Sequence, residues 1–151
     1  DVVVDAGVYV CLMHMKGDPR SMQDDPRYDD VCAEVYGYLL SRIDACRAKG
    51  IQMNRIIADP GIGFGKTVEH NLTILNQLKK FESLGVPIML AASRKRFIGA
   101  LSGGAEPAQR LPGSLAAAIA GWERGARVFR VHDVAETAQA LAVFGAISRI
   151  D

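Results

Sequence analysis

Four short runs of apolar, strand-forming residues constrain this chain more than any other feature. They lie at residues 8–15, 56–58, 86–92 and 127–131. Each is followed by a stretch in which apolar residues recur every three or four positions, as they do along a helix. These helical stretches lie at residues 29–49, about 68–84, 113–124 and 133–148. The spacing of roughly 30 to 50 residues between successive runs predicts βα units with parallel strands.

Further sequence patterns predict shorter elements between these units. Residues 1–7 have the pattern of a last helical turn ended by a glycine. A short helix is predicted at about 96–101, and a Gly- and Pro-rich loop at 102–112. Asp133 and Glu136 have the spacing of a capping box, which predicts that the last helix begins at this point.

Two α/β architectures are compatible with four such units. One is a piece of a doubly wound sheet, and the other is half of a (β/α)8 TIM barrel, which typically needs about 250 residues. The sequence has 151 residues and opens inside a helical pattern, without a methionine. This favours the half barrel, so we expect residues 1–151 to be one part of a single domain whose N-terminal half is absent.

The overall composition excludes several classes of protein. Hydrophobic residues make up 49% and charged residues 23% of the chain, which is typical of a folded domain and not of a disordered one. A net charge of +1 does not indicate a nucleic-acid or membrane partner, and no apolar stretch approaches the roughly 20 residues of a membrane span. The three cysteines lack metal-site spacing, so we expect small buried thiols and a reducing, cytoplasmic location.

Charged side chains gather where the predicted strands end. Lys16 follows the first run, Asp59 the second and Lys95 the third, while Arg130 lies within the fourth and His132 just after it. Since parallel strands end at the same edge, we expect a single ligand site there. One carboxylate would hold a guanidine-like ligand edge, and the cations would hold a phosphorylated or carboxylated group. The alternatives are that Asp59 only caps its Asp-Pro-Gly turn and that His132 is structural.

The stretch at residues 61–67, Gly-Ile-Gly-Phe-Gly-Lys-Thr, superficially looks like a phosphate-binding P-loop. That motif requires a glycine five positions before the glycine that precedes the lysine. Pro60 occupies this position, and proline has no N–H to offer a phosphate. The pattern therefore does not favour a nucleotide hydrolase. The glycines would instead allow a flat polar ligand to approach the backbone closely.

Four motifs in combination resemble the dihydropteroate synthases. They are Leu-Met-His-Met-Lys-Gly-Asp-Pro at 12–19, Asp-Pro-Gly-Ile-Gly-Phe-Gly-Lys at 59–66, Ser-Arg-Lys-Arg-Phe-Ile-Gly at 93–99 and Arg-Val-His-Asp-Val at 130–134. Their order and spacing match the family over essentially the whole chain. The resemblance implies a pterin-binding barrel, with this chain as its second half, strands five to eight. It also implies a transferase that joins 4-aminobenzoate to 6-hydroxymethyl-7,8-dihydropterin diphosphate and releases diphosphate in folate biosynthesis.

The resemblance also implies roles for single residues at the pterin and diphosphate sites. Asp59 matches the aspartate that binds the pterin edge, and Met13 matches an apolar residue of the same pocket. Lys95 and Arg130 are implied to contact the pterin ring. Arg130 and His132 are implied to bind the diphosphate, and these two residues together with Lys95 would be the catalytic groups.

Further implications concern the second substrate and the partners. Phe64, Ser93 and Lys95 would line the 4-aminobenzoate site, which makes the protein a sulfonamide target. A magnesium ion is implied, but its protein ligand is expected in the N-terminal half, so no metal ligand is expected in this chain. A homodimer is implied for the full-length protein. The chain departs from the family at Ala91, where glycine is usual, and the added methyl would narrow the pterin slot slightly.

Two other interpretations stay open at this point. A related barrel binds methyl-tetrahydrofolate and passes its methyl group to a corrinoid protein, but it would not be expected to keep both the Ser-Arg-Lys and Arg-Val-His motifs. The chain alone could also be a non-catalytic remnant. In any case we expect little catalysis from these residues by themselves, because half of the pocket is absent and the sheet edges are open.

Overall fold

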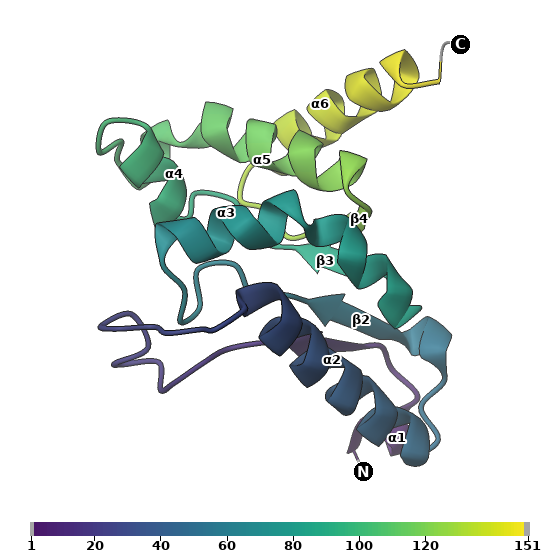
Figure 1. Ribbon diagram of the computed structural model, residues 1–151. Coiled ribbons are helices and arrows are strands. Elements are labelled where there is room, and N and C mark those ends of the chain that lie inside the picture. The colour runs from purple at the N-terminus through teal and green to yellow at the C-terminus, as the bar shows by residue number, and fades with distance from the viewer. Residues whose placement is uncertain (1, 150–151) are drawn as a thin grey trace.

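The computed structural model describes residues 2–149, and its centre is a sheet of four parallel strands (Figure 1). The strands are β1 (Val10–Met13), β2 (Ile56–Asp59), β3 (Ile88–Leu90) and β4 (Ala126–Phe129). Each strand pairs with the next one along the chain, in the order β1-β2-β3-β4. A doubly wound sheet reverses its order at a switch point, whereas a barrel does not. The strand order therefore supports the half barrel.

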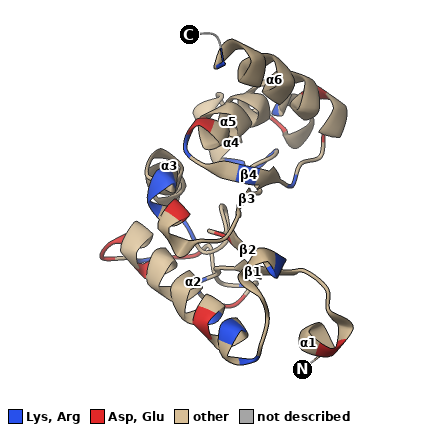
Figure 2. Ribbon diagram, turned by 90° about the vertical axis from the view of Figure 1, so that its right-hand side faces the viewer, with Lys and Arg blue, Asp and Glu red and all other residues tan. Residues whose placement is uncertain are grey.

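The helices are α1 (Val2–Ala6), α2 (Val31–Ala48), α3 (Val68–Asn76), α4 (Arg96–Leu101), α5 (Leu111–Glu123) and α6 (Val134–Ile147). The longer helices cover one side of the sheet, whereas α1 has no buried residue. Short 3-10 turns lie at η1 (Met53–Arg55), η2 (Leu78–Leu84) and η3 (Pro107–Gln109). Helices α2, α3, α5 and α6 contact one another in sequence, so they form a continuous outer row around the strands (Figure 2). None of the helices among the described residues combines the length and apolar character needed to span a bilayer.

Helix α2 shows why the outer row forms where it does. Asp30 precedes the helix and its carboxylate accepts N–H groups of the first turn, which supplies the N-cap. Val35, Leu39 and Ile43 follow at helical spacing and are at most 1% exposed. This apolar stripe packs against β1 and α3, while the polar side faces away from the core.

One predicted helix is wrong in part. The stretch expected as a single helix over 68–84 is α3 followed by the 3-10 turn η2, with Gln77 between them. Leu78, Phe81 and Leu84 are spaced by three residues and all are buried. A 3-10 turn has three residues per turn, so it places all three side chains on one face toward the core. The apolar spacing therefore matches the tighter helix.

The start of α5 and the cap of α6 also differ from expectation. Helix α5 begins at Leu111, inside the predicted loop, and Pro112 lies in its first turn, where no N–H is required. The predicted capping box at Asp133 is wrong, because this residue makes no side-chain cap bond to α6. Its carboxylate is instead bound by the guanidinium of Arg94.

The fourth strand ends earlier than expected. Arg130 lies just beyond β4, which ends at Phe129, and its backbone N–H donates to the carbonyl of Leu90 at 3.1 Å.

The expectation that all three cysteines are buried is wrong. They are free thiols, but only Cys32 is buried and Cys11 is exposed. Cys11 lies in β1, where successive side chains point to opposite faces. Its exposure follows because no helix among residues 2–149 covers the inner face of the sheet.

Neighbouring leucines of α2 give a stability test of this packing. Leu39 is 0% and Leu40 39% exposed. We expect Leu39→Ala to lower the free energy of unfolding by about 2–5 kcal/mol because it leaves a cavity in the core. Leu40→Ala should change it by less than about 0.5 kcal/mol. Urea titration followed by circular dichroism measures both, and equal effects of the two substitutions would contradict the assigned helix face.

Candidate active site

The parallel register brings the four motifs to one edge of the sheet. Met13 is opposite Asp59 where β1 and β2 end, and Leu90 is opposite Phe129 where β3 and β4 end. The residues that follow these strand ends therefore face a common space. The structure thus brings the strand-end residues that were expected to form a site to one edge of the sheet.

Asp59 is the central carboxylate of this edge. It is 2% exposed, and its Oδ1 accepts the N–H of Gly61 at 2.7 Å. Burial raises the pKa of Asp59, while the Gly61 N–H and the nearby positive charges of Arg130 and Lys95 act to lower it. The turn-capping interpretation is therefore correct for Oδ1. Among the hydrogen bonds of the described residues none engages Oδ2, which leaves that oxygen available to a ligand.

Lys95 connects the loop after β3 to the glycine loop. Its Nζ lies 4.0 Å from the centroid of the Phe64 ring, within the range of a cation–π contact. Burial lowers the pKa of Lys95, the carboxylate of Asp59 opposes this shift and Arg130 adds to it. The positive charge and the aromatic ring thus form one half-buried surface next to Asp59.

Ser93 and His132 bind each other across the ends of β3 and β4. The Oγ of Ser93 accepts the His132 N–H at 3.2 Å and lies 3.0 Å from His132 Nδ1. Ser93 is buried and His132 is exposed. The serine hydroxyl is therefore engaged with the histidine, which fixes the orientation of the imidazole ring at the edge of the site.

Arg94 adds a second connection between the same two strand ends. Its Nε donates to Asp133 Oδ2 at 3.0 Å, and its Nη2 donates to Oδ1. Its backbone has φ 56°, which is uncommon for a residue with a side chain. Bonds from its N–H to Ser114 and from Arg110 to its carbonyl hold this conformation. Local sequence patterns do not predict these partners, because they lie 16 to 39 positions from Arg94.

A buried lysine and histidine lie beneath the glycine loop. Lys66 is 3% and His14 is 6% exposed, and Lys66 Nζ lies 2.9 Å from His14 Nδ1. Both side chains are therefore in the interior. Burial lowers the pKa of Lys66 to about 7, against the attraction of Asp59. Burial and the neighbouring Lys66 lower the pKa of His14 to about 4. No role in the site is predicted for Lys66 from the sequence, although it ends the motif at 59–66.

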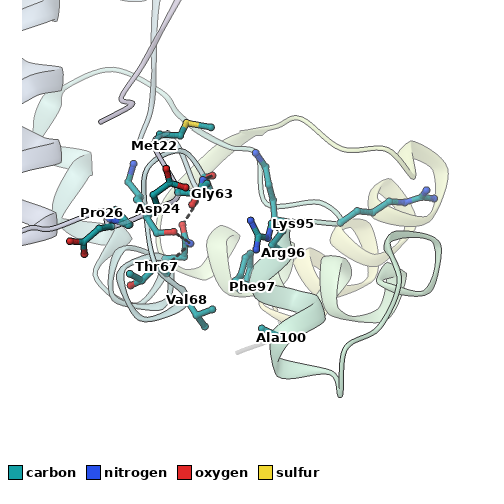
Figure 3. Close-up of a pocket in the computed structure, with 15 residues that line it drawn as sticks. Met22, Asp24, Pro26, Gly63, Thr67, Val68, Lys95, Arg96, Phe97 and Ala100 are labelled. Atoms are coloured by element: carbon teal, nitrogen blue, oxygen red, sulfur yellow. Dashed lines mark hydrogen bonds between the residues drawn. The ribbon is translucent and has the colours of Figure 1, made fainter. Parts of the chain in front are cut away.

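A cavity of about 640 Å³ adjoins the site (Figure 3). Residues 22–26 form one wall and residues 94–97 the other, with Gly63 between them. Neither Asp59 nor Phe64 is among the residues that line this cavity. The cavity adjoins the glycine loop through Gly63 and Lys66, and the loop after β3 through Lys95.

The donor set of the site does not fit a metal. Among residues 2–149 no three His, Cys, Asp or Glu side chains lie close enough together to hold an ion. The groups that act on the charge of Asp59 are the basic side chains of Arg130, Lys95 and Lys66. Such groups suit an anionic ligand and not a cation.

Comparisons with known proteins agree with this geometry. The family model described as "Pterin binding enzyme" matches residues 1–132. The dihydropteroate synthase of Escherichia coli K12 is 43% identical over 143 residues, which cover 95% of this chain and 50% of that protein. The chain thus spans about half the length of this curated relative.

Solved structures give the same result. The Xanthomonas albilineans dihydropteroate synthase with 4-aminobenzoic acid has a TM-score of 0.93 and 46% identity, covering 100% of this chain and 53% of that one. Another structure of that protein contains 7,8-dihydropteroate. The Yersinia pestis dihydropteroate synthase in complex with a sulfonamide drug has a TM-score of 0.92 and 39% identity, covering 96% and 53%. These neighbours are TIM barrels, so the four strands form half of a barrel. The chain belongs to the family of pterin-binding enzymes.

Proposed function

We propose that this chain is the C-terminal half, strands five to eight, of a dihydropteroate synthase. The observation that carries the proposal is the buried Asp59 carboxylate, which keeps Oδ2 available beside Lys95 and Arg130. A pterin presents an amino group and a ring N–H on one edge, and a carboxylate can accept both. The names of the Escherichia coli and Xanthomonas albilineans relatives support the same activity.

The pterin would lie on the inner face of the sheet, between Asp59 and the side chain of Met13. These two residues are direct neighbours in the β1–β2 register, so an apolar surface lies next to the carboxylate. Lys95 and Arg130 would contact the ring from the other two strand ends. The three charged groups thus orient the heterocycle without a covalent bond to the protein.

The 4-aminobenzoate would lie beside Phe64, with Lys95 between the two substrates. The cation–π contact between Lys95 and Phe64 supports a shared surface for an aromatic acid. Ser93 would act mainly through His132, to which its hydroxyl is bound. Sulfonamides would compete at this surface, consistent with the complex of the Yersinia pestis relative.

Arg130 and His132 would hold the diphosphate as it leaves. The bond between the pterin methylene carbon and the diphosphate oxygen breaks, and the oxygen takes the electron pair. Positive side chains at that oxygen stabilise the developing charge. The amine of 4-aminobenzoate then forms the new carbon–nitrogen bond and loses a proton. Lys95, placed between the two substrates, is the third catalytic group of this proposal.

Partners and location are also part of the proposal. Magnesium would be held by residues outside this chain, since residues 2–149 contain no cluster of His, Cys, Asp or Glu side chains that could hold it. The small-molecule substrates would be the only ligands, without nucleic acid or membrane, in a homodimer of the full-length protein. Three free cysteines support a reducing, cytoplasmic compartment.

A comparison of the complete polypeptide with residues 1–151 alone tests the activity. We expect diphosphate release from the complete protein only when both substrates are present. The chain alone should be at least about a hundredfold slower, because loss of two or more charged contacts costs about 3 kcal/mol or more. A complete protein that binds methyl-tetrahydrofolate and releases no diphosphate would instead be the methyl-transferring relative.

Asp59→Asn tests the pterin contact. The amide loses one of two acceptor oxygens and the charge, so we expect pterin affinity in the complete protein to fall about tenfold to a hundredfold. Asp44→Asn on the exposed side of α2 is the matched control and should leave affinity unchanged. Isothermal titration calorimetry measures both, and unchanged affinity of the Asp59 variant would contradict the assigned role.

His132→Gln tests whether His132 contacts the diphosphate or the pterin ring. We expect affinity for the pterin diphosphate to fall about tenfold, because one charge-assisted contact is lost. Affinity for the unphosphorylated pterin should stay the same and serves as the internal control. Equal losses for both ligands would show that His132 acts on the pterin or on the fold.

A further inference from the structure

The glycine loop, residues 60–65, needs something to hold its shape. Gly61, Gly63 and Gly65 have φ of 70°, 80° and 60°, in the region that glycine adopts most freely. Backbone preference alone therefore does not fix the loop. Yet the loop carries Phe64, and the Gly61 N–H binds Asp59. The position of both site residues depends on a loop with weak local preferences.

Lys66 restrains the loop at Gly61 and Phe64, in addition to Asn71, whose Oδ1 accepts the Gly63 N–H. Its Nζ donates to the carbonyl of Gly61 at 3.0 Å and to that of Phe64 at 3.1 Å, and it lies 2.9 Å from His14 Nδ1. An ammonium has three N–H donors, so these three acceptors match it one for one. The side chain thus spans the loop from its first glycine to Phe64 and is itself 3% exposed.

His14 fixes the other end of this contact. Its backbone N–H donates to the carbonyl of Asp59 at 3.1 Å, which continues the pairing of β1 with β2. Its low pKa, about 4, keeps the ring neutral, so Nδ1 can accept a hydrogen bond. The ring of Tyr38 lies 5.1 Å away in an edge contact and confines the imidazole. Lys66 is therefore anchored on a rigid strand end.

Close packing explains why the loop has glycines where it approaches the chain after β1. A Cβ on Gly61 would lie 1.8 Å from the carbonyl oxygen of His14, and one on Gly65 would lie 2.2 Å from that of Lys16. Tyr28 adds a hydrogen bond from its hydroxyl to the Gly65 carbonyl at 2.7 Å. Lys66 is the only one of these groups that reaches the Phe64 carbonyl among the described residues.

We propose that Lys66, held by His14, is a positioning residue that places the Phe64 ring for the aromatic amine substrate. This rests on the proposed function. The pair acts on Phe64 more than on Asp59, because Asp59 is also held by the pairing of β1 with β2. Lys66 does not take part in bond making, since its donors are used within the loop.

Lys66→Met in the complete polypeptide tests the role, because methionine keeps the length and apolar volume of the side chain. We expect the KM for 4-aminobenzoate to rise about tenfold, as for loss of one charge-assisted bond. The KM for the pterin diphosphate should change less than about threefold. A purely structural role would lower the amount of active enzyme and leave both KM values unchanged, and that result would overturn the proposal.

Two variants of His14 provide the matched control. His14→Gln retains an acceptor for Lys66 and should change the KM for 4-aminobenzoate less than about threefold. His14→Leu removes the acceptor and should reproduce the effect of Lys66→Met. Equal effects of the glutamine and leucine variants would overturn the role of the Nδ1 contact.

The contact between His14 and Lys66 can also be tested on the wild-type protein, without a substitution or an activity assay. Nitrogen-15 NMR should show the His14 ring with its proton on Nε2 and a pKa near 4, well below the ordinary value of 6.5. A proton on Nδ1, or titration near 6.5, would overturn the contact with Lys66. If the ring behaves as expected but the complete protein releases no diphosphate, the proposed function fails and the restraint on the loop stands.

Discussion

The parallel register of the four strands is the constraint on which the rest of the site depends. It places Met13 beside Asp59 and aligns Leu90 with Phe129. Every loop that leaves a strand therefore starts from the same edge, so residues from Met13 to His132 can share one ligand. Without this alignment the charged side chains would be isolated surface groups, each worth little.

Burial of charge is the second requirement, and glycine makes it possible. Asp59 and Lys66 are both almost fully buried, which is costly for charged groups unless each finds hydrogen-bond partners. The glycine loop provides an N–H for the carboxylate and two carbonyls for the ammonium. The same loop thus satisfies both charges and places Phe64 against Lys95.

Much of the fold and part of the site could be predicted from the sequence. The four βα units are encoded by local periodicity, and the charged strand ends follow from them once the strands are parallel. The division of residues 68–84 into α3 and the 3-10 turn η2 could not be predicted in the same way. Apolar residues spaced by three or four positions fit both an α-helix and a 3-10 helix, and only contact with the core selects the 3-10 turn.

The sequence by itself determined the fold class, the residues of the four motifs and the gathering of charged residues at the strand ends. Only the tertiary structure decided which of these residues bind one another. Asp133, expected as a helix cap, binds Arg94, 39 positions away. Lys66 finds His14 across 52 positions. Periodicity and turn chemistry act between near neighbours, whereas hydrogen bonds between buried polar groups depend on distances that exist only after the strands have paired.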